Sequence, residues 1–128
     1  MELQKKLKKS LKEITKNDFQ EQLDEINSKK IILVEGKKDS AALKKLGLKN
    51  KIFILNKPLF EVVEEISRQT KNVILLTDLD SEGKKLYSKL KKDFQQHGIK
   101  IDDKFREFLF KTQLRQIEGM DTYYDKLN

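Results

Sequence analysis

Acidic residues stand at two points where a short apolar run ends. Glu35 follows Ile31–Val34, and Asp78 and Asp80 follow the run at residues 73–76. Carboxylate oxygens are the ligands that hard divalent cations prefer, and alternating aspartates can turn both side chains toward one crevice. The simpler alternative is that these acids only cap helices, because a helix N-terminus stabilises a negative charge.

A glycine and two lysines lie close behind each acidic position. Glycine lets the backbone approach a bulky phosphate and turn sharply, and the helix that follows offers N–H groups to an anion. The predicted phosphate-binding residues are therefore Gly36, Lys37, Lys38, Gly83, Lys84 and Lys85. A metal held beside them would polarise a phosphoryl oxygen and activate water, which is the chemistry of phosphodiester cleavage.

The composition limits which metal this site takes. The chain has no cysteine and one histidine, His97, so thiolate zinc sites, cysteine nucleophiles and multi-histidine sites are excluded. Any metal must be bound by oxygen, which favours magnesium, manganese or calcium. The net charge of +7 favours a polyanionic partner, since lysines displace counterions from phosphates.

Apolar runs alternate with helical periodicity across the middle of the chain. Buried parallel strands are predicted at residues 30–35, 52–55 and 72–77, and helices at 39–46, after Pro58, and from about Leu86 to Phe94. This alternation predicts an α/β fold with a parallel sheet and helices on both faces. A strand order of 2-1-3 would place Glu35 beside Asp78 and Asp80, at the carboxyl edge where such sheets bind ligands.

The two ends of the chain are predicted to be helical additions. Residues 2–27 have the apolar spacing of one amphipathic helix or two, which either binds a partner or, as we favour, packs on the domain's own sheet. Residues 99–101 predict a short fourth strand, and 102–116 a helix. The segment KTQLRQIEGM, at 111–120, either packs beside the site or contacts RNA or, as we favour, is a solvated helix. Tyr123 and Tyr124 are expected to be packing or surface residues.

Two segments resemble the motifs of a known family. Ile32–Asp39, with the sequence ILVEGKKD, is similar to the first motif of Toprim domains, and Leu76–Gly83, LTDLDSEG, to the second. Toprim domains occur in type IA and type II topoisomerases, bacterial-type primases, recombination-repair proteins and small nucleases such as the 5S ribosomal RNA maturase. The resemblance covers residues 29–100. It implies a Toprim-like, Rossmann-type parallel sheet of three to four strands, with an N-terminal helix and a C-terminal helical tail.

The resemblance also implies roles for particular residues. Glu35 matches the glutamate that acts as a general acid or base or joins the metal shell. Asp78 and Asp80 match the magnesium-binding pair, Glu82 matches a further acid of the topoisomerase-like motif, and Lys37 matches a basic position. The implied catalytic residues are Glu35, Asp78 and Asp80, the implied metal ligands are these three with Glu82, and the implied cofactor is Mg²⁺, with Mn²⁺ as an alternative.

Departures from the family motifs narrow the set of Toprim proteins that this chain resembles. Ser81 stands where the topoisomerase motif has arginine, and no second domain presents a tyrosine nucleophile. Primases carry a zinc-binding domain for which this chain has no cysteines. The chain therefore resembles small stand-alone Toprim proteins, with domain boundaries expected at 1–28 for the N-terminal helix, 29–101 for the Toprim-like domain and 102–128 for the C-terminal extension.

Three functions follow from these features. The first is magnesium-dependent RNA processing by endonucleolytic cleavage. The second is metal-dependent binding of RNA or a ribonucleoprotein without turnover, and the third is a structural domain whose acids only cap helices. RNA is favoured over DNA as the partner, and the terminal helices are possible contacts for a protein or ribonucleoprotein. No apolar run is long enough to span a bilayer, so we expect a cytoplasmic protein without a membrane partner.

Overall fold

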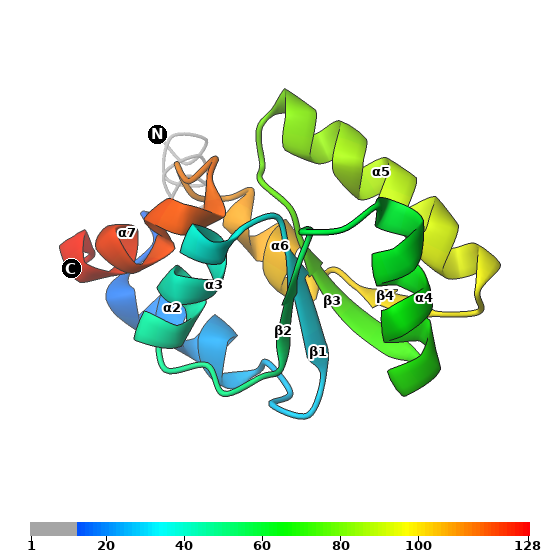
Figure 1. Ribbon diagram of the computed structural model, residues 1–128. Coiled ribbons are helices and arrows are strands. Elements are labelled where there is room, and N and C mark those ends of the chain that lie inside the picture. The colour runs from blue at the N-terminus through cyan, green and yellow to red at the C-terminus, as the bar shows by residue number, and fades with distance from the viewer. Residues whose placement is uncertain (1–12) are drawn as a thin grey trace, which may run out of the picture.

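Four parallel strands form one sheet in the computed structural model, which describes residues 13–128 (Figure 1). The strands are β1 (Ile31–Val34), β2 (Ile52–Ile54), β3 (Asn72–Leu76) and β4 (Lys100–Asp102). Their order is β2-β1-β3-β4, which confirms the predicted α/β class, the neighbouring positions of β1 and β3, and the fourth strand. The two central strands are covered on both faces, which explains why their sequences are continuously apolar.

Helices cover both faces of the sheet, as predicted (Figure 1). Those described are α2 (Lys16–Asp24), α3 (Lys37–Lys45), α4 (Leu59–Gln69), α5 (Ser81–Gln96), α6 (Lys104–Leu109) and α7 (Met120–Lys126), with a 3₁₀ turn, η1, at Ile117–Gly119. Successive strand residues point to opposite faces. Leu33 and Leu75 therefore pack with α4 and α5, whereas Val34 and Leu76 pack with the remaining helices.

The boundaries of the central helices follow local signals. Gly47 and Gly98 have φ angles of 88° and 72°, the left-handed conformation with which glycine commonly follows a helix. At its other end α5 begins after Asp80, whose carboxylate accepts a hydrogen bond from the Gly83 amide at 2.8 Å. Helix α3 begins at Lys37, two residues before the predicted start.

The C-terminal extension differs from the prediction. Helix α6 ends at Leu109 instead of continuing to residue 116, and the segment at 111–120 is not a solvated helix. Thr112 ends the helix because its hydroxyl donates to the Leu109 carbonyl at 2.6 Å and accepts from the Leu114 amide at 3.1 Å. Such local bonds replace the helical ones. Leu114 and Ile117 are buried, so this segment packs against the domain.

Helices α2 and α7 pack together around Phe19, which is fully buried. Its ring lies 5.9 Å from Tyr123 and 5.8 Å from Tyr124, which confirms both tyrosines as packing residues. The Tyr124 hydroxyl also donates to Gln20 at 2.8 Å. The predicted helical stripe before residue 13 lies outside the described residues. None of the helices in residues 13–128 combines the length and apolarity needed to cross a bilayer.

Candidate metal and phosphate site

The carboxyl edge of the two central strands brings Glu35 and Asp78 together. Val34 of β1 pairs with Leu76 of β3, so the residues that follow leave the sheet side by side. One Glu35 oxygen, Oε2, accepts a hydrogen bond from the Asp78 amide at 2.6 Å. Asp78 Oδ1 in turn accepts from the Ile117 amide at 2.9 Å. Each carboxylate uses one oxygen in these bonds, so the other oxygen of each is available to a ligand.

An open crevice lies at this edge, and we call it the acid crevice. Its lining residues are Glu35, Gly36, Lys37, Lys38, Asp39, Asp78, Gln116 and Glu118. The first turn of α3 contributes the two lysines, and the Asp39 carboxylate accepts from the Gly36 amide at 2.9 Å. Three predicted phosphate-binding residues therefore share one crevice with two predicted metal ligands.

Asp80 lies in an adjoining hollow. Residues Gln116 and Glu118 line both this hollow and the acid crevice, so the two depressions are neighbours. One carboxylate oxygen of Asp80 accepts the hydrogen bond from the Gly83 amide at the start of α5, which is the capping role that the simpler alternative predicts. Its charge nevertheless contributes to raising the pKa of Glu35. The helix-cap and metal-site interpretations of Asp80 are therefore compatible.

The acid crevice carries uncompensated negative charge. Burial raises the pKa of Glu35 above its ordinary value, and the nearby charges of Asp78, Asp39 and Asp80 raise it further, against the hydrogen bond from the Asp78 amide. Burial likewise raises the pKa of Asp39, with contributions from Asp78 and Glu118. A proton or a cation relieves such a cluster, because each removes repulsion between like charges.

The donor set fits a divalent metal. Within residues 13–128, no group of three or more histidine or acidic side chains is arranged to hold an ion by itself. Mg²⁺ does not require such a cage, since it usually keeps several waters and takes one or two carboxylates together with substrate phosphates. The free oxygens of Glu35 and Asp78, in a crevice whose charge favours a cation, meet that requirement, and Asp80 stands next to them.

The remaining predicted residues lie away from the acid crevice. Glu82 is exposed on α5 and approaches Lys85 at 3.6 Å. Lys84 lies over the Phe110 ring, 5.5 Å from its centroid. None of these three lines the crevice. The lysines that follow the second motif thus extend the basic surface of α5 but are not brought to the two metal-ligand candidates.

Gly83 has a structural role that was not predicted. A Cβ atom at this position would lie 2.0 Å from the Asp78 carbonyl oxygen, so α5 packs directly on the backbone of the site. The Thr77 hydroxyl also donates to the Gly83 carbonyl at 2.8 Å. At Gly36 a Cβ would meet nothing closer than Asp39 Oδ2 at 3.9 Å, which is ordinary contact. The close approach at Gly83 is therefore to the protein's own chain.

Several residues of the site carried no recognisable signal in the sequence. Gln116 and Glu118 come from the C-terminal extension, about which the two motifs say nothing. Arg106 of α6 is buried and donates to the Asp78 carbonyl at 3.0 Å. Asp39 does belong to the first motif, and its short distance from Glu35 in the sequence is the one signal that could have identified it.

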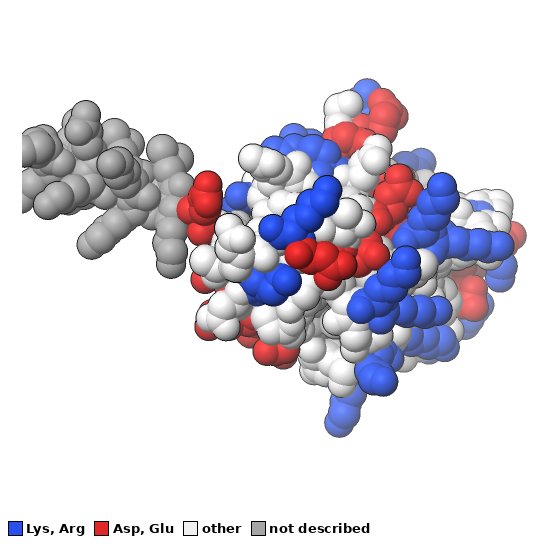
Figure 2. Space-filling model, turned by 90° about the vertical axis from the view of Figure 1, so that its left-hand side faces the viewer, with Lys and Arg blue, Asp and Glu red and all other residues white. Residues whose placement is uncertain are grey.

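A mixed charge pattern surrounds the site. Figure 2 shows the face on the side of α3 and α7, where acidic side chains gather in the middle of the surface and many Lys and Arg side chains stand beside them. Lys37 and Lys38 are exposed on α3, which supplies part of this basic surface. The arrangement combines groups that attract a cation with neighbouring groups that attract a phosphate.

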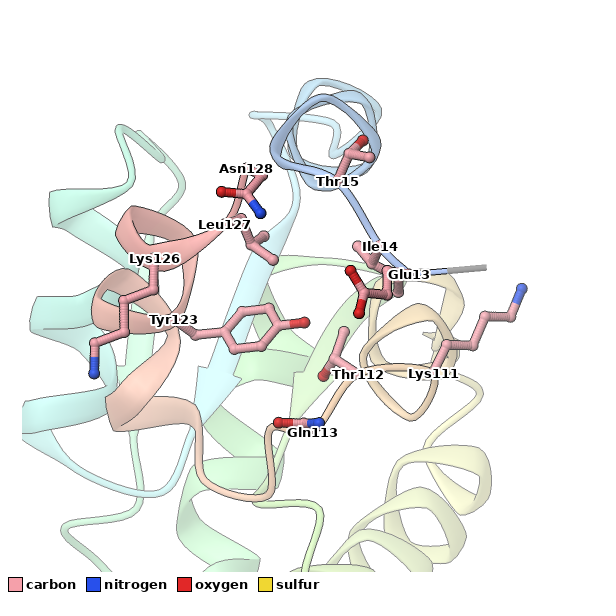
Figure 3. Close-up of a pocket in the computed structure, with 10 residues that line it drawn as sticks. All are labelled: Glu13, Ile14, Thr15, Lys111, Thr112, Gln113, Tyr123, Lys126, Leu127 and Asn128. Carbon is pink, nitrogen blue, oxygen red and sulfur yellow. The ribbon is translucent and has the colours of Figure 1, made fainter. Parts of the chain in front are cut away.

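The depression continues from the site toward α7. Gln113 and Tyr123 line both the hollow beside Asp80 and a further pocket, which we call the terminal pocket. In Figure 3 the Tyr123 ring reaches from α7 toward Glu13 and Thr112, while Lys111 and Lys126 stand on opposite sides of the pocket. Shared lining residues thus place the acid crevice, the hollow beside Asp80 and the terminal pocket in one row of adjoining hollows, which we call the groove.

Comparisons with known proteins agree with this architecture. The Toprim domain family model matches residues 29–103. A UPF0292 protein of Methanocaldococcus jannaschii is 37% identical over 102 residues, which cover 76% of this chain and 80% of that protein. A UPF0292 protein of Pyrococcus abyssi is 38% identical over 95 residues, covering 73% and 71%.

A solved structure supports the same assignment. A protein from Aquifex aeolicus superimposes with a TM-score of 0.72 at 36% identity, covering 78% of this chain and 95% of the other. Residues 29–103, which the family model matches, contain both acidic strand ends, the parallel sheet that joins them and Gly83, through which α5 packs on Asp78. The chain therefore belongs to the Toprim-domain family and is similar to its short UPF0292 members.

Proposed function

We propose that this protein is a magnesium-dependent endoribonuclease that processes structured or single-stranded RNA. Membership of the Toprim family supports the coarser statement, a metal-dependent function on nucleic acid. The observation that carries the proposal is the contact between Glu35 and Asp78, which are 43 residues apart in the sequence, in a crevice that also contains Lys37 and Lys38. This combination of two carboxylates and two lysines favours a phosphodiester-binding site over the alternative that the acids only cap helices.

Each residue has a defined task in this proposal. Asp78 and Asp80 would hold Mg²⁺, and a metal bound there would supply a Lewis acid for the phosphoryl oxygen and would lower the pKa of a water. Glu35 accepts a proton from the attacking water. Its raised pKa suits that task, because a general base works best when its pKa lies near the working pH. Lys37 and Lys38 contact the phosphate from the N-terminal turn of α3.

The groove, as a row of adjoining hollows, favours a polymeric substrate over a small one. A small phosphate ester would fill only the acid crevice, whereas a nucleic-acid strand can extend past Gln116 and Gln113 to the terminal pocket. Tyr123 offers an aromatic ring on this path, and Lys111 and Lys126 offer cations at its far end. Aromatic stacking and cationic contacts are the usual means of holding single strands.

Cleavage of cellular RNA tests the proposal. Wild type, an Asp78→Asn/Asp80→Asn variant and a Glu61→Gln/Glu64→Gln control on the exposed side of α4 are incubated with total RNA, with and without Mg²⁺, and new 5′ ends are mapped. We expect discrete ends with wild type and the control only when Mg²⁺ is present, and at least a hundred-fold fewer ends with the aspartate variant.

The same experiment separates turnover from binding. Magnesium-dependent retention of RNA by the wild type without new ends would replace the nuclease with a binding factor. Ends that persist in the aspartate variant would indicate a contaminating nuclease. Absence of both cleavage and retention would leave the acids as helix caps and would sink the proposal.

A further inference from the structure

Arg106 is a buried cation without an ionic partner. Its residue is 3% exposed, and within residues 13–128 no ion pair joins it to an acid. Its guanidinium lies 4.1 Å from the centroid of the Tyr87 ring and 4.9 Å from that of Phe110, and its Nε has no hydrogen-bond partner. Burial of a charge costs stability unless its contacts compensate. We therefore ask which groups Arg106 contacts, because those contacts indicate its role.

Those contacts converge on the backbone beneath the acid crevice. Arg106 Nη2 donates to the Asp78 carbonyl at 3.0 Å and lies 3.3 Å from the Thr77 hydroxyl oxygen. The Thr77 hydroxyl donates onward to Gly83. Asp78 is therefore fixed at three points, because its amide donates to Glu35, its carboxylate accepts from Ile117, and its carbonyl accepts from Arg106.

We propose that Arg106 is a positioning residue for the acid pair: it holds Asp78 by its carbonyl so that the Asp78 carboxylate faces a divalent cation with the Glu35 carboxylate beside it. This inference rests on the proposed metal-dependent function and deepens it. Arg106 touches neither the metal nor the phosphodiester. It acts through Asp78, whose amide contacts Glu35 and whose carbonyl contacts Arg106 of α6.

Arginine suits this task better than lysine. The planar guanidinium reaches two acceptors while stacking on aromatic rings, whereas an ammonium is a point charge on a flexible stem. Substitution by lysine therefore distinguishes a positioning role of Arg106 from a purely electrostatic one. If only the positive charge mattered, Arg106→Lys would leave metal affinity unchanged, and Arg106→Met would tighten it by removing a repelling cation.

The experiment compares Arg106→Lys, Arg106→Met and a matched control, Arg68→Met on the exposed surface of α4. Mg²⁺ dissociation constants are measured by isothermal titration calorimetry on the full chain after metal removal, at a temperature where thermal scans show every variant folded. We expect both Arg106 variants to bind Mg²⁺ about ten-fold or more weakly, as is typical when an outer partner of a metal ligand is lost. The control should match the wild type.

Wild-type affinity in Arg106→Lys, or tighter binding in Arg106→Met, would overturn the positioning role. If Arg106→Met does not fold, Arg106→Lys alone decides the question. A purely structural role would lower thermal stability but leave the affinity of the folded protein unchanged, and that outcome also overturns the proposal.

Amide hydrogen exchange keeps this inference separable from the proposed function. Exchange at Asp78 is followed by NMR without any metal. We expect exchange of the Asp78 amide to accelerate in both Arg106 variants but not in the control, because Asp78 loses one of its three hydrogen bonds to other parts of the chain. If the wild type binds no Mg²⁺, the proposed function fails, but the exchange rate still shows whether Arg106 holds Asp78 in place. Unchanged exchange at Asp78 in both variants would contradict that hold.

Discussion

Glu35 is the residue at which stability and function oppose one another. Its pKa is raised by burial and by neighbouring acids, so the folded chain binds this proton more tightly than the unfolded chain does. Its favourable contribution to stability is therefore fully present below the unfolded pKa and is lost as the pH rises through the folded pKa. Asp39 contributes in the same direction. Near neutral pH the ionised acid crevice destabilises the fold.

Glu35→Gln should therefore stabilise the protein at pH 7 while abolishing RNA cleavage. The glutamine oxygen still accepts from the Asp78 amide, but the repelled charge is gone. We expect the melting temperature without metal to rise by a few degrees at pH 7, and the difference from wild type to shrink near about pH 4, where the wild-type carboxyl is protonated. Differential scanning calorimetry at both pH values measures this, with the exposed Glu61→Gln as the control.

A lower melting temperature for Glu35→Gln at pH 7 would show that the hydrogen bond to Asp78 outweighs the repulsion. Full cleavage activity in this variant would remove Glu35 from the proposed proton transfer, whatever its stability.

At the residue scale, the sequence predicted the acids but not their supports. Glu35 and Asp78 could be identified because each follows a buried strand and belongs to a motif. Arg106 lies on a helix that the sequence did predict, but nothing in the spacing indicated that its side chain contacts Asp78. The approach of Glu118 depends on where Thr112 ends α6 and how residues 110–116 return to the domain, which is decided by tertiary contacts rather than by local propensity.

The element that most directly shapes the site is the first turn of α5. It packs so closely on β3 that a Cβ at Gly83 would lie 2.0 Å from the Asp78 carbonyl oxygen. Backbone atoms cannot move aside as a flexible side chain can. The same contact thus sets the position of the helix and the path of the chain through Asp78.

Gly83→Ala is expected to destabilise the fold by about 3 kcal/mol and to weaken Mg²⁺ binding. Overpacking of a tight contact costs about 1–3 kcal/mol and occasionally more, which exceeds the gain of up to about 1 kcal/mol from alanine's better helix propensity. Urea unfolding measures the change. Gly119→Ala is the matched control, because its Cβ would meet Leu114 only at 3.8 Å.

A stabilised Gly83→Ala variant would mean that propensity outweighs the contact, and the close packing of α5 would then not constrain the site. Loss of stability in Gly119→Ala of similar size would point to a general cost of replacing glycine by alanine rather than to the Asp78 contact.

Elements were predicted well where periodicity was strong. The three main strands, their order and the helices between them follow from alternating apolar runs. The C-terminal extension was predicted poorly, because its apolar residues Leu114 and Ile117 are buried from a loop and a 3₁₀ turn rather than from a regular helix.

The molecule as a whole combines one acidic crevice with a basic surface. The net charge is +7, yet the site itself repels anions until a cation is bound. Affinity for a polyanion therefore needs further lysines besides Lys37 and Lys38, which line the crevice itself. The groove toward the terminal pocket offers two of them, Lys111 and Lys126, on its opposite sides (Figure 3).

Lys111→Ala/Lys126→Ala should weaken binding of single-stranded RNA and reduce its salt dependence. Each lost phosphate contact lowers the slope of log affinity against log salt by about 0.7 for single strands, so two lost contacts lower it by about 1.4. Fluorescence anisotropy without Mg²⁺ measures the slope in the absence of cleavage. Lys49→Ala/Lys71→Ala, at the amino ends of β2 and β3, has the same charge change away from the groove.

Equal slopes for the two double variants would place the RNA elsewhere on the basic surface. A lower slope for the Lys49/Lys71 variant alone would move the binding path to the amino edge of the sheet and would separate it from the acid crevice.

The hydrogen bond between Asp78 and Ile117 also has a consequence for synthesis. A ribosome makes Glu35 and Asp78 well before it makes Ile117, and domains complete their packing only when the required segments have emerged. A nascent chain thus contains the acids before the segment that fixes one of them. Completion of the site is delayed until residue 117 leaves the exit tunnel, so a chain truncated before residue 117 would carry both motifs and yet lack this attachment.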